Sequence, residues 1–237
     1  MDMELPILYE DDDLLAVHKP EGLAAIPERD PSRPSARHLL EAARGERLWV
    51  IHRLDKEASG VLLFARNAEA HRYMNTRFER RQVRKVYRAL VHGRIEPGQG
   101  QIQAPIRMYG SGRMGVDPER GKPAETRYRV LEYLDEACSL IEALPLTGRR
   151  HQIRVHCYHV GHPIVGDPRY GDRSVQQRYP RLMLHALSIR FRHPNGQELE
   201  IVAPVPESFQ QVLDALRTEL AAPTTDHSAT TSSPSST

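Results

Sequence analysis

In the stretch HRLDKEASGVLLFA (residues 52–65), a charged turn runs straight into an apolar segment. The continuous apolar run from Val61 to Ala65 has the length of a buried strand, and Trp49-Val50-Ile51 predicts another strand before the turn. Asp55 therefore lies on a loop between two buried strands, where rigid scaffolds often hold reactive groups. A carboxylate at the mouth of a buried strand costs free energy unless its charge is used or paired. Asp55 is thus the first candidate for chemistry; the alternative is a turn-capping residue or a surface ion pair.

Alternating and β-branched patterns predict that much of the remaining chain forms strands. These strands cover residues 7–9, 14–20, 83–91, 125–133, 139–144, 182–191 and 198–202. Helical spacing predicts helices over residues 35–44, 67–80 and 208–220, the second capped by Asn67. Residues 107–123 are Gly-rich and basic and predict a mobile loop, whereas residues 150–158 fit a strand that runs into a helix. Short turns between successive strands indicate hairpins, and the pattern as a whole favours an α+β fold.

The length of 237 residues suits one good-sized domain, which we place at residues 1–220. Residues 221–237 consist mostly of Ala, Pro, Thr and Ser and predict a disordered tail. No apolar run approaches the roughly 20 residues that span a bilayer, and the N-terminus has no secretory signal pattern. The two cysteines, Cys138 and Cys157, fit free thiols in a reducing compartment. We therefore expect a soluble, cytoplasmic protein, and nothing in the sequence demands more than a monomer.

Basic residues gather in one block, although the formal net charge of the chain is only +2. Between His71 and Arg94, eight basic residues accompany a single acid, Glu79: Arg72, Arg77, Arg80, Arg81, Arg84, Lys85, Arg88 and Arg94. Such a block is typical of phosphate contacts with nucleic acid, with a solvated helix face as the alternative. Tyr87 lies inside the block, either as a stacking platform for a base or as a core aromatic residue.

A second basic segment, Thr147-Gly148-Arg149-Arg150-His151-Gln152-Ile153-Arg154-Val155-His156, combines arginines with Gln and His. This combination suits recognition of phosphates and base edges, and a cationic surface strand is the alternative. The histidines around Cys157 lack the spacing of a zinc site, so we expect no metal. Phosphate-loop, dinucleotide-binding and nucleophile-elbow motifs are absent from the sequence, so we expect no cofactor. A lone carboxylate, an arginine motif, a tyrosine and a basic face together suit chemistry on a nucleobase within RNA.

Several motifs resemble those of one family, the RluA-type pseudouridine synthases. The stretch at residues 52–60 is similar to the family's His-Arg-Leu-Asp-x-x-Thr-Ser-Gly, and residues 85–93 are similar to its Lys-x-Tyr-x-Ala-x-Val-x-Gly strand. Residues 147–156 resemble its arginine motif and residues 161–167 the segment that follows. Shorter matches occur at Lys122-Pro123-Ala124 and Leu184-His185-Ala186. The resemblance covers roughly residues 7 to 204 in colinear order.

The resemblance implies a mixed, largely antiparallel sheet with flanking helices and loops around a central catalytic cleft. It implies an enzyme that cleaves the glycosidic bond of specific uridines in tRNA or rRNA and rejoins the base through carbon 5, without cofactor or metal. Asp55 would be the catalytic carboxylate, acting either as a nucleophile or as a base on the ribose. Arg154 would be its counter-charge, and Tyr87 would stack on the extruded base. Leu184 would also contact the substrate, and Arg53 would act as a wedge in the vacated base stack.

Two departures from the family pattern are visible. Ala58 stands where the family usually has Thr, which removes one hydroxyl near the catalytic turn. The chain also begins directly with the first strand, so we expect no separate N-terminal RNA-binding domain, and the catalytic domain must bind structured RNA alone. Two rival hypotheses remain: a catalytically silent RNA-binding module on the same fold, and a metal-dependent nuclease, whose activity would be sensitive to chelators.

Overall fold

The computed structural model describes residues 4–28, 30, 32–134 and 136–221. Its helices are α1 (Ala36–Arg44), α2 (Ala68–Glu79), α3 (Gln152–His159), α4 (Arg173–Gln176) and α5 (Glu207–Ala221). Its strands are β1 (Ile7–Glu10), β2 (Leu14–Lys19), β3 (Trp49–Val50), β4 (Ser59–Ala65), β5 (Arg84–His92), β6 (Gln99–Gln103), β7 (Ile106–Met108), β8 (Met114–Val116), β9 (Glu125–Leu134), β10 (Cys138–Pro145), β11 (Leu184–Arg192) and β12 (Glu198–Val202).

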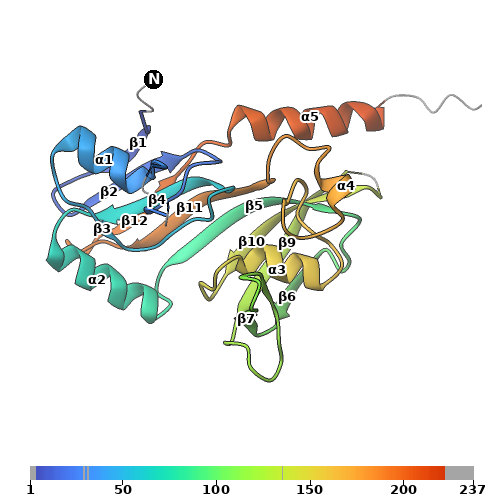
Figure 1. Cartoon of the computed structure of the whole chain (residues 1–237), viewed down its shortest axis with the longest axis horizontal. Helices are drawn as coiled ribbons and strands as arrows, with labels where there is room; N and C mark the ends of the chain where they lie inside the picture. Colours follow the sequence, from blue (N-terminus) through green and yellow to red (C-terminus); the bar gives the residue numbers. More distant parts are fainter. Residues whose placement is uncertain (1–3, 29, 31, 135, 222–237) are drawn as a thin grey trace, which may run out of the picture.

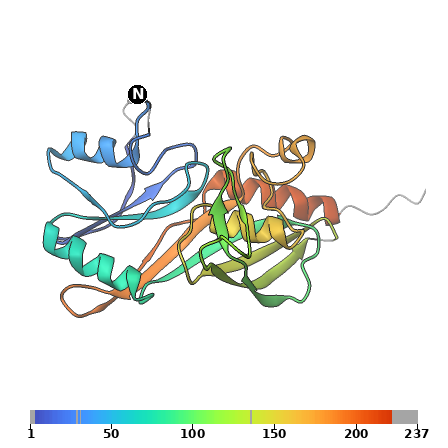
Figure 2. The same cartoon turned by 60° about the horizontal axis from the view of Figure 1, so that its bottom comes forward.

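A ten-stranded sheet forms the body of the molecule, in the order β1-β2-β4-β11-β5-β10-β9-β6, with β3 beside β4 and β12 beside β11. β4 and β11 run parallel, and the other pairs of the described sheet are antiparallel. Two long strands, β5 and β11, connect the half that carries α1 and α2 with the half that carries α3 and α5 (Figures 1 and 2). The fold is α+β with a mixed, largely antiparallel sheet, which confirms the predicted class.

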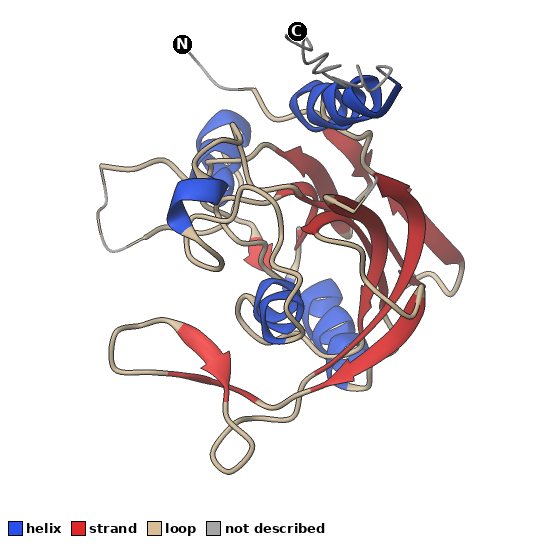
Figure 3. Cartoon of the chain, turned by 90° about the vertical axis from the view of Figure 1, so that its right-hand side faces the viewer, coloured by secondary structure: helices blue, strands red, loops and turns tan. Residues whose placement is uncertain are grey.

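The apolar run from Val61 to Ala65 is continuous because β4 is buried on both faces. Val61 and Leu63 pack in the same cluster as Met74 of α2, while Leu62 and Phe64 pack in the cluster that contains α1. Figure 3 shows the sheet as a curved wall around helices at the centre of the view. This packing fixes the start of β4, and with it the loop that carries Asp55.

Close contact between β4 and β11 requires a glycine at the start of β4. Gly60 has φ +123°, and a Cβ there would lie 2.2 Å from the carbonyl oxygen of Ala186. Next to it, the Ser59 hydroxyl lies 2.9 Å from His185 Nδ1 and accepts a hydrogen bond from Arg181. These buried polar contacts and the tight backbone approach connect the end of the loop that carries Asp55 to the middle of the sheet.

The structure corrects the prediction for residues 107–123. A loop was expected there, but β7 and β8 form a two-stranded hairpin. Ile106 and Met114 are buried in a small cluster with Val155 and Tyr170, and this distant packing stabilises strands of only three residues. The ambiguous segment at residues 150–158 is mainly the helix α3, and β6 and α4 were not predicted. The tail was predicted to begin at residue 221, but Ala221 ends α5; residues 222–237 lie outside the described residues.

Candidate active site

One pocket of about 320 Å³ brings together all five residues that the sequence singled out. Asp55 and Arg53 come from the loop before β4, Tyr87 from β5, Arg154 from α3 and Leu184 from β11. The pocket lies between that loop and the turn that joins β10 to α3. Four segments far apart in the chain therefore build a single concave site.

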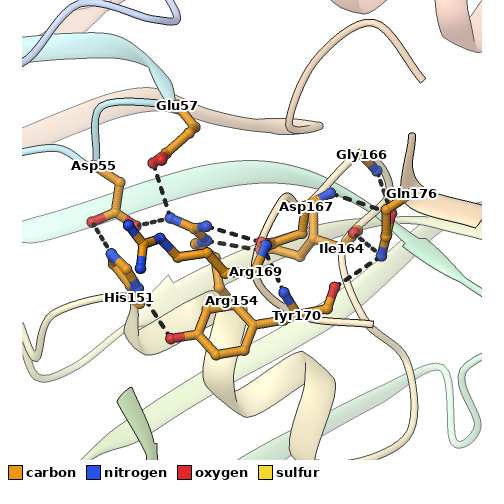
Figure 4. A network of polar contacts seen from close by, with 10 residues as sticks. All are labelled: Asp55, Glu57, His151, Arg154, Ile164, Gly166, Asp167, Arg169, Tyr170 and Gln176. Atoms are coloured by element: carbon orange, nitrogen blue, oxygen red, sulfur yellow. Dashed lines mark hydrogen bonds and ion pairs between the residues drawn. The ribbon is translucent and has the colours of Figure 1, made fainter. Parts of the chain in front are cut away.

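Asp55 lies at the mouth of this pocket, with 16% of its side chain exposed. Its Oδ2 lies 3.2 Å from Nη1 of Arg154, and its Oδ1 lies 3.9 Å from Nε2 of His151 (Figure 4). The backbone N–H of Ala58 donates to the carbonyl of Asp55 at 3.2 Å, so a backbone hydrogen bond closes the turn. The Ala58 methyl group is buried in the core. The turn that carries Asp55 is therefore closed without a side-chain hydroxyl at position 58.

Arg154 is completely buried and contacts three carboxylates. Its Nε and Nη2 each donate to Asp167 at 2.8 Å, a bidentate pair in which neither side chain is exposed. Its Nη1 lies 3.2 Å from both Asp55 and Glu57. Burial alone lowers the pKa of Arg154, but the hydrogen bonds and charge of Asp167 raise it above its usual value, helped by Asp55 and Glu57. The guanidinium therefore stays charged in the core.

Asp167 is the main partner of Arg154, and the sequence did not reveal it. Two further donors, the backbone N–H groups of Arg169 and Tyr170, hold its Oδ1 at 2.9 and 3.2 Å. Gln176 accepts from the Asp167 backbone and bonds the carbonyls of Ile164 and Tyr170 (Figure 4). This loop after α3 thus holds Nε and Nη2 of the guanidinium and leaves Nη1 to face the pocket.

The walls of the pocket combine apolar and polar side chains. Leu184 is 4% exposed, and Tyr87 lies on β5 beside Ala186 of β11. Burial raises the pKa of Tyr87, and the charge of Asp55 raises it further, so its hydroxyl remains protonated at neutral pH. Arg53, in contrast, is exposed at the rim. The pocket thus offers both apolar and charged contacts beside Asp55, and Arg53 is a cation at its exposed edge.

A fully buried lysine forms hydrogen bonds with the loop that carries Asp55. Lys19 donates to the carbonyls of Pro20, Leu23 and Lys56 at 2.7, 2.8 and 3.2 Å. Burial lowers the pKa of Lys19 to about 7, against the opposing charge of Asp55. Because Lys56 follows Asp55 directly, this ammonium joins the end of β2 to the turn that carries Asp55. From the sequence, Lys19 was predicted only as part of the strand over residues 14–20.

Part of the predicted basic block lies in a second groove beside the pocket. This groove of about 500 Å³ contains Arg81, Arg84, Arg127 and Arg190, and Lys85 lines both cavities. Arg84 and Arg190 lie directly opposite each other on neighbouring strands. Glu200 lies opposite Arg190 on β12 and Glu198 also lines the groove, so the groove is mainly but not wholly basic.

Among the described residues, no three His, Cys, Asp or Glu side chains are grouped as a metal site. Within the same part of the chain, no helix has the length and apolar character needed to cross a membrane.

Comparisons with known proteins place these features in context. The family described as RNA pseudouridylate synthase matches the chain over residues 13–159. Ribosomal large subunit pseudouridine synthase C of Vibrio vulnificus (strain CMCP6) is 41% identical over 221 residues, covering 90% of this chain and 69% of that protein. Synthase D of Pseudomonas aeruginosa is 37% identical over 235 residues, covering 91% and 73%. The solved structure of human RNA Pseudouridylate Synthase Domain Containing 1 superimposes with a TM-score of 0.74 at 32% identity, covering 92% of this chain and 96% of that chain.

Proposed function

The chain belongs to the RNA pseudouridylate synthase family, and we propose that Asp55 is the carboxylate with which this isomerase converts uridine to pseudouridine in large-subunit ribosomal RNA. The reaction breaks the bond between N1 of the base and C1′ of the ribose and forms a bond between C5 and C1′. C5 loses its proton and N1 gains one, so the reaction is balanced without any co-reactant. The choice of ribosomal RNA follows from the names of the relatives.

The observation that carries the assignment is the place of Asp55 in the pocket. Asp55 and Glu57 lie at the same distance, 3.2 Å, from the same nitrogen of Arg154, but only Asp55 lines the pocket. A nucleophile that attacks C1′, or a base that removes a ribose proton, must reach the bound nucleotide. Either role fits Asp55, and neither fits Glu57.

The remaining pocket residues suit a nucleotide that has left its stack. Extrusion of a base costs a few kcal/mol, and stacking on the Tyr87 ring offsets about 1–3 kcal/mol of that cost. Leu184 offers an apolar surface near the same site. Arg53 at the rim is placed to enter the space that the base has left. Arg154, held by Asp167, opposes the negative charge of Asp55 once water has been displaced.

Groups from a single chain surround Asp55, so we propose that the enzyme acts as a monomer with its catalytic unit in residues 1–220. A cytoplasmic location fits work on ribosomal RNA. Mapping pseudouridines in total RNA from cells with and without the protein tests the substrate. Loss of a site in large-subunit rRNA is expected, and loss confined to tRNA would overturn the choice of ribosomal RNA.

Asp55→Asn tests the catalytic assignment, with Glu57→Gln as the matched control. Both changes remove one carboxylate from Nη1 of Arg154 and preserve the side-chain size. We expect Asp55→Asn to abolish tritium release from 5-tritiated uridine in RNA while RNA binding persists, and Glu57→Gln to retain most of the turnover. Full activity of Asp55→Asn, or equal loss in both variants, would contradict the assignment.

A further inference from the structure

His151 occupies an unusual position at the start of α3. Its backbone has φ +55° and ψ +23°, a left-handed conformation that costs most residues free energy, and Asn, Asp and His tolerate it best. Its side chain is 6% exposed and lines the pocket. This conformation turns the imidazole edge toward Asp55, where Nε2 lies 3.9 Å from Oδ1 (Figure 4).

The other ring nitrogen of His151 contacts a buried tyrosine hydroxyl. Nδ1 lies 3.0 Å from the hydroxyl of Tyr170, which is buried under the β7–β8 hairpin. Burial raises the pKa of Tyr170, while the backbone N–H of Met114 lowers it by hydrogen bonding to the phenol oxygen. Because that oxygen already accepts from Met114, its own proton is available for Nδ1 of His151. The Tyr170 hydroxyl can thus act as the donor in this contact.

The imidazole is neutral at physiological pH. Burial lowers the pKa of His151 to about 3, and the charges of Arg154, Arg150 and Arg169 act in the same direction, against Glu57. A neutral ring carries one proton, so a ring that accepts at Nδ1 must carry this proton on Nε2. The other tautomer would direct a lone pair at the carboxylate of Asp55, an unfavourable arrangement.

We propose that His151 is a positioning residue that donates its Nε2–H to Oδ1 of Asp55, in a tautomer set by Tyr170, when RNA closes the pocket. Arg154 then holds Oδ2 and His151 holds Oδ1, so the carboxylate plane is fixed from two sides. The 3.9 Å separation shortens to a hydrogen bond as water leaves, which is usual for catalytic contacts that are loose in the free enzyme. This inference rests on the proposed role of Asp55.

Substitutions that mimic each ring nitrogen test the donor. The amide of His151→Asn suits the left-handed backbone but reaches only as far as Nδ1, whereas His151→Gln places its amide near Nε2. We expect the single-turnover rate at saturating RNA to fall about 10- to 100-fold in His151→Asn, the effect of losing a hydrogen bond to a charged group. His151→Gln should be faster than His151→Asn, although its backbone preference is worse. His159→Gln, an exposed change on the same helix, is the control.

Tyr170→Phe tests the second link, since it removes the hydroxyl and keeps the ring that packs against Met114 and Val155. We expect this rate to fall about 3- to 10-fold, with RNA affinity unchanged. Two-bond proton–nitrogen NMR of the full chain with ¹⁵N-labelled histidine reports the tautomer directly. His151 should carry its proton on Nε2, and Tyr170→Phe should populate the other tautomer.

Each readout can refute the inference. A proton on Nδ1 in the unaltered protein, a normal rate for His151→Asn, or a change confined to RNA affinity would each overturn it. The NMR result does not depend on turnover, so it is separable from the role of Asp55. Activity in Asp55→Asn would refute the proposed catalytic assignment, whatever tautomer His151 adopts.

Discussion

Replacing Asp167 by Asn should lower the free energy of unfolding, because it leaves the buried charge of Arg154 without its principal partner. Neither side chain of the pair is exposed, and the two hydrogen bonds between them are both 2.8 Å long. The new amide would also place a donor where the guanidinium needs an acceptor. Asp55 and Glu57 remain, but both share one nitrogen at 3.2 Å.

Breaking a buried ion pair by removing one partner costs about 3–5 kcal/mol. In a domain of this size each kcal/mol lowers the melting temperature by about 2–4 °C, so the expected decrease is about 6–20 °C. The chain offers a matched exposed pair. Arg217 holds Glu132 through the same two kinds of nitrogen, at 3.0 and 2.6 Å, but the side chains are 40% and 36% exposed. Such surface pairs contribute about 0–1 kcal/mol.

Urea unfolding of Asp167→Asn and Glu132→Gln, followed by circular dichroism, measures both costs on one scale. We expect a loss of at least about 3 kcal/mol for the first variant and under about 1 kcal/mol for the second. Equal losses would refute the argument, since burial is the main difference between the two pairs. Turnover of folded Asp167→Asn should also fall, because Nη1 of Arg154 loses its fixed position next to Asp55.

Three other expectations follow from the structure. Arg53→Ala should slow turnover on structured RNA much more than on an unpaired substrate; equal losses would contradict its role as a wedge. Burial lowers the pKa of His185 from 6.5 to about 4, so the unfolded chain binds more protons between these values and the free energy of unfolding falls as pH drops through that window. His185→Gln should reduce this pH slope by up to about 1.4 kcal/mol per pH unit, and an unchanged slope would refute it. A double variant with Arg84→Ala and Arg190→Ala should bind RNA more weakly. The slope of log affinity against log salt concentration should fall by about two phosphate contacts, and an unchanged slope would exclude the groove as an RNA-binding surface.

The main strands could be predicted because their patterns are local. The run from Val61 to Ala65 and the hairpin between β9 and β10 follow from periodicity and turn residues alone. The β7–β8 hairpin could not be predicted in this way. Its strands have three residues each, too few to show a period, and their stability comes from Met114 and Ile106 packing on Val155 and Tyr170.

The site was predictable where one residue type carries the chemistry. Asp55 and Tyr87 stand out by type and position, whereas the choice of Arg154 among several arginines came from the family resemblance; the fold brings all three to one pocket. Asp167 does not stand out, because an aspartate in a Gly-rich loop is usually a turn residue. A signal was nevertheless present: Arg154 lies between Ile153 and Val155 on a buried helix, so it requires a counter-charge somewhere in the chain.

The three nitrogens of the Arg154 guanidinium have different partners, so one arginine can bind a buried carboxylate and also face the proposed catalytic carboxylate. Asp167 takes Nε and Nη2, which fixes the guanidinium plane, and only Nη1 faces the solvent-accessible carboxylates. Before RNA binds, water still reaches Asp55, so its attraction to Nη1 is partly screened. When a base fills the pocket and displaces that water, the same contact strengthens because the local dielectric falls. Weakening this contact should therefore slow the chemical step more than it weakens RNA binding.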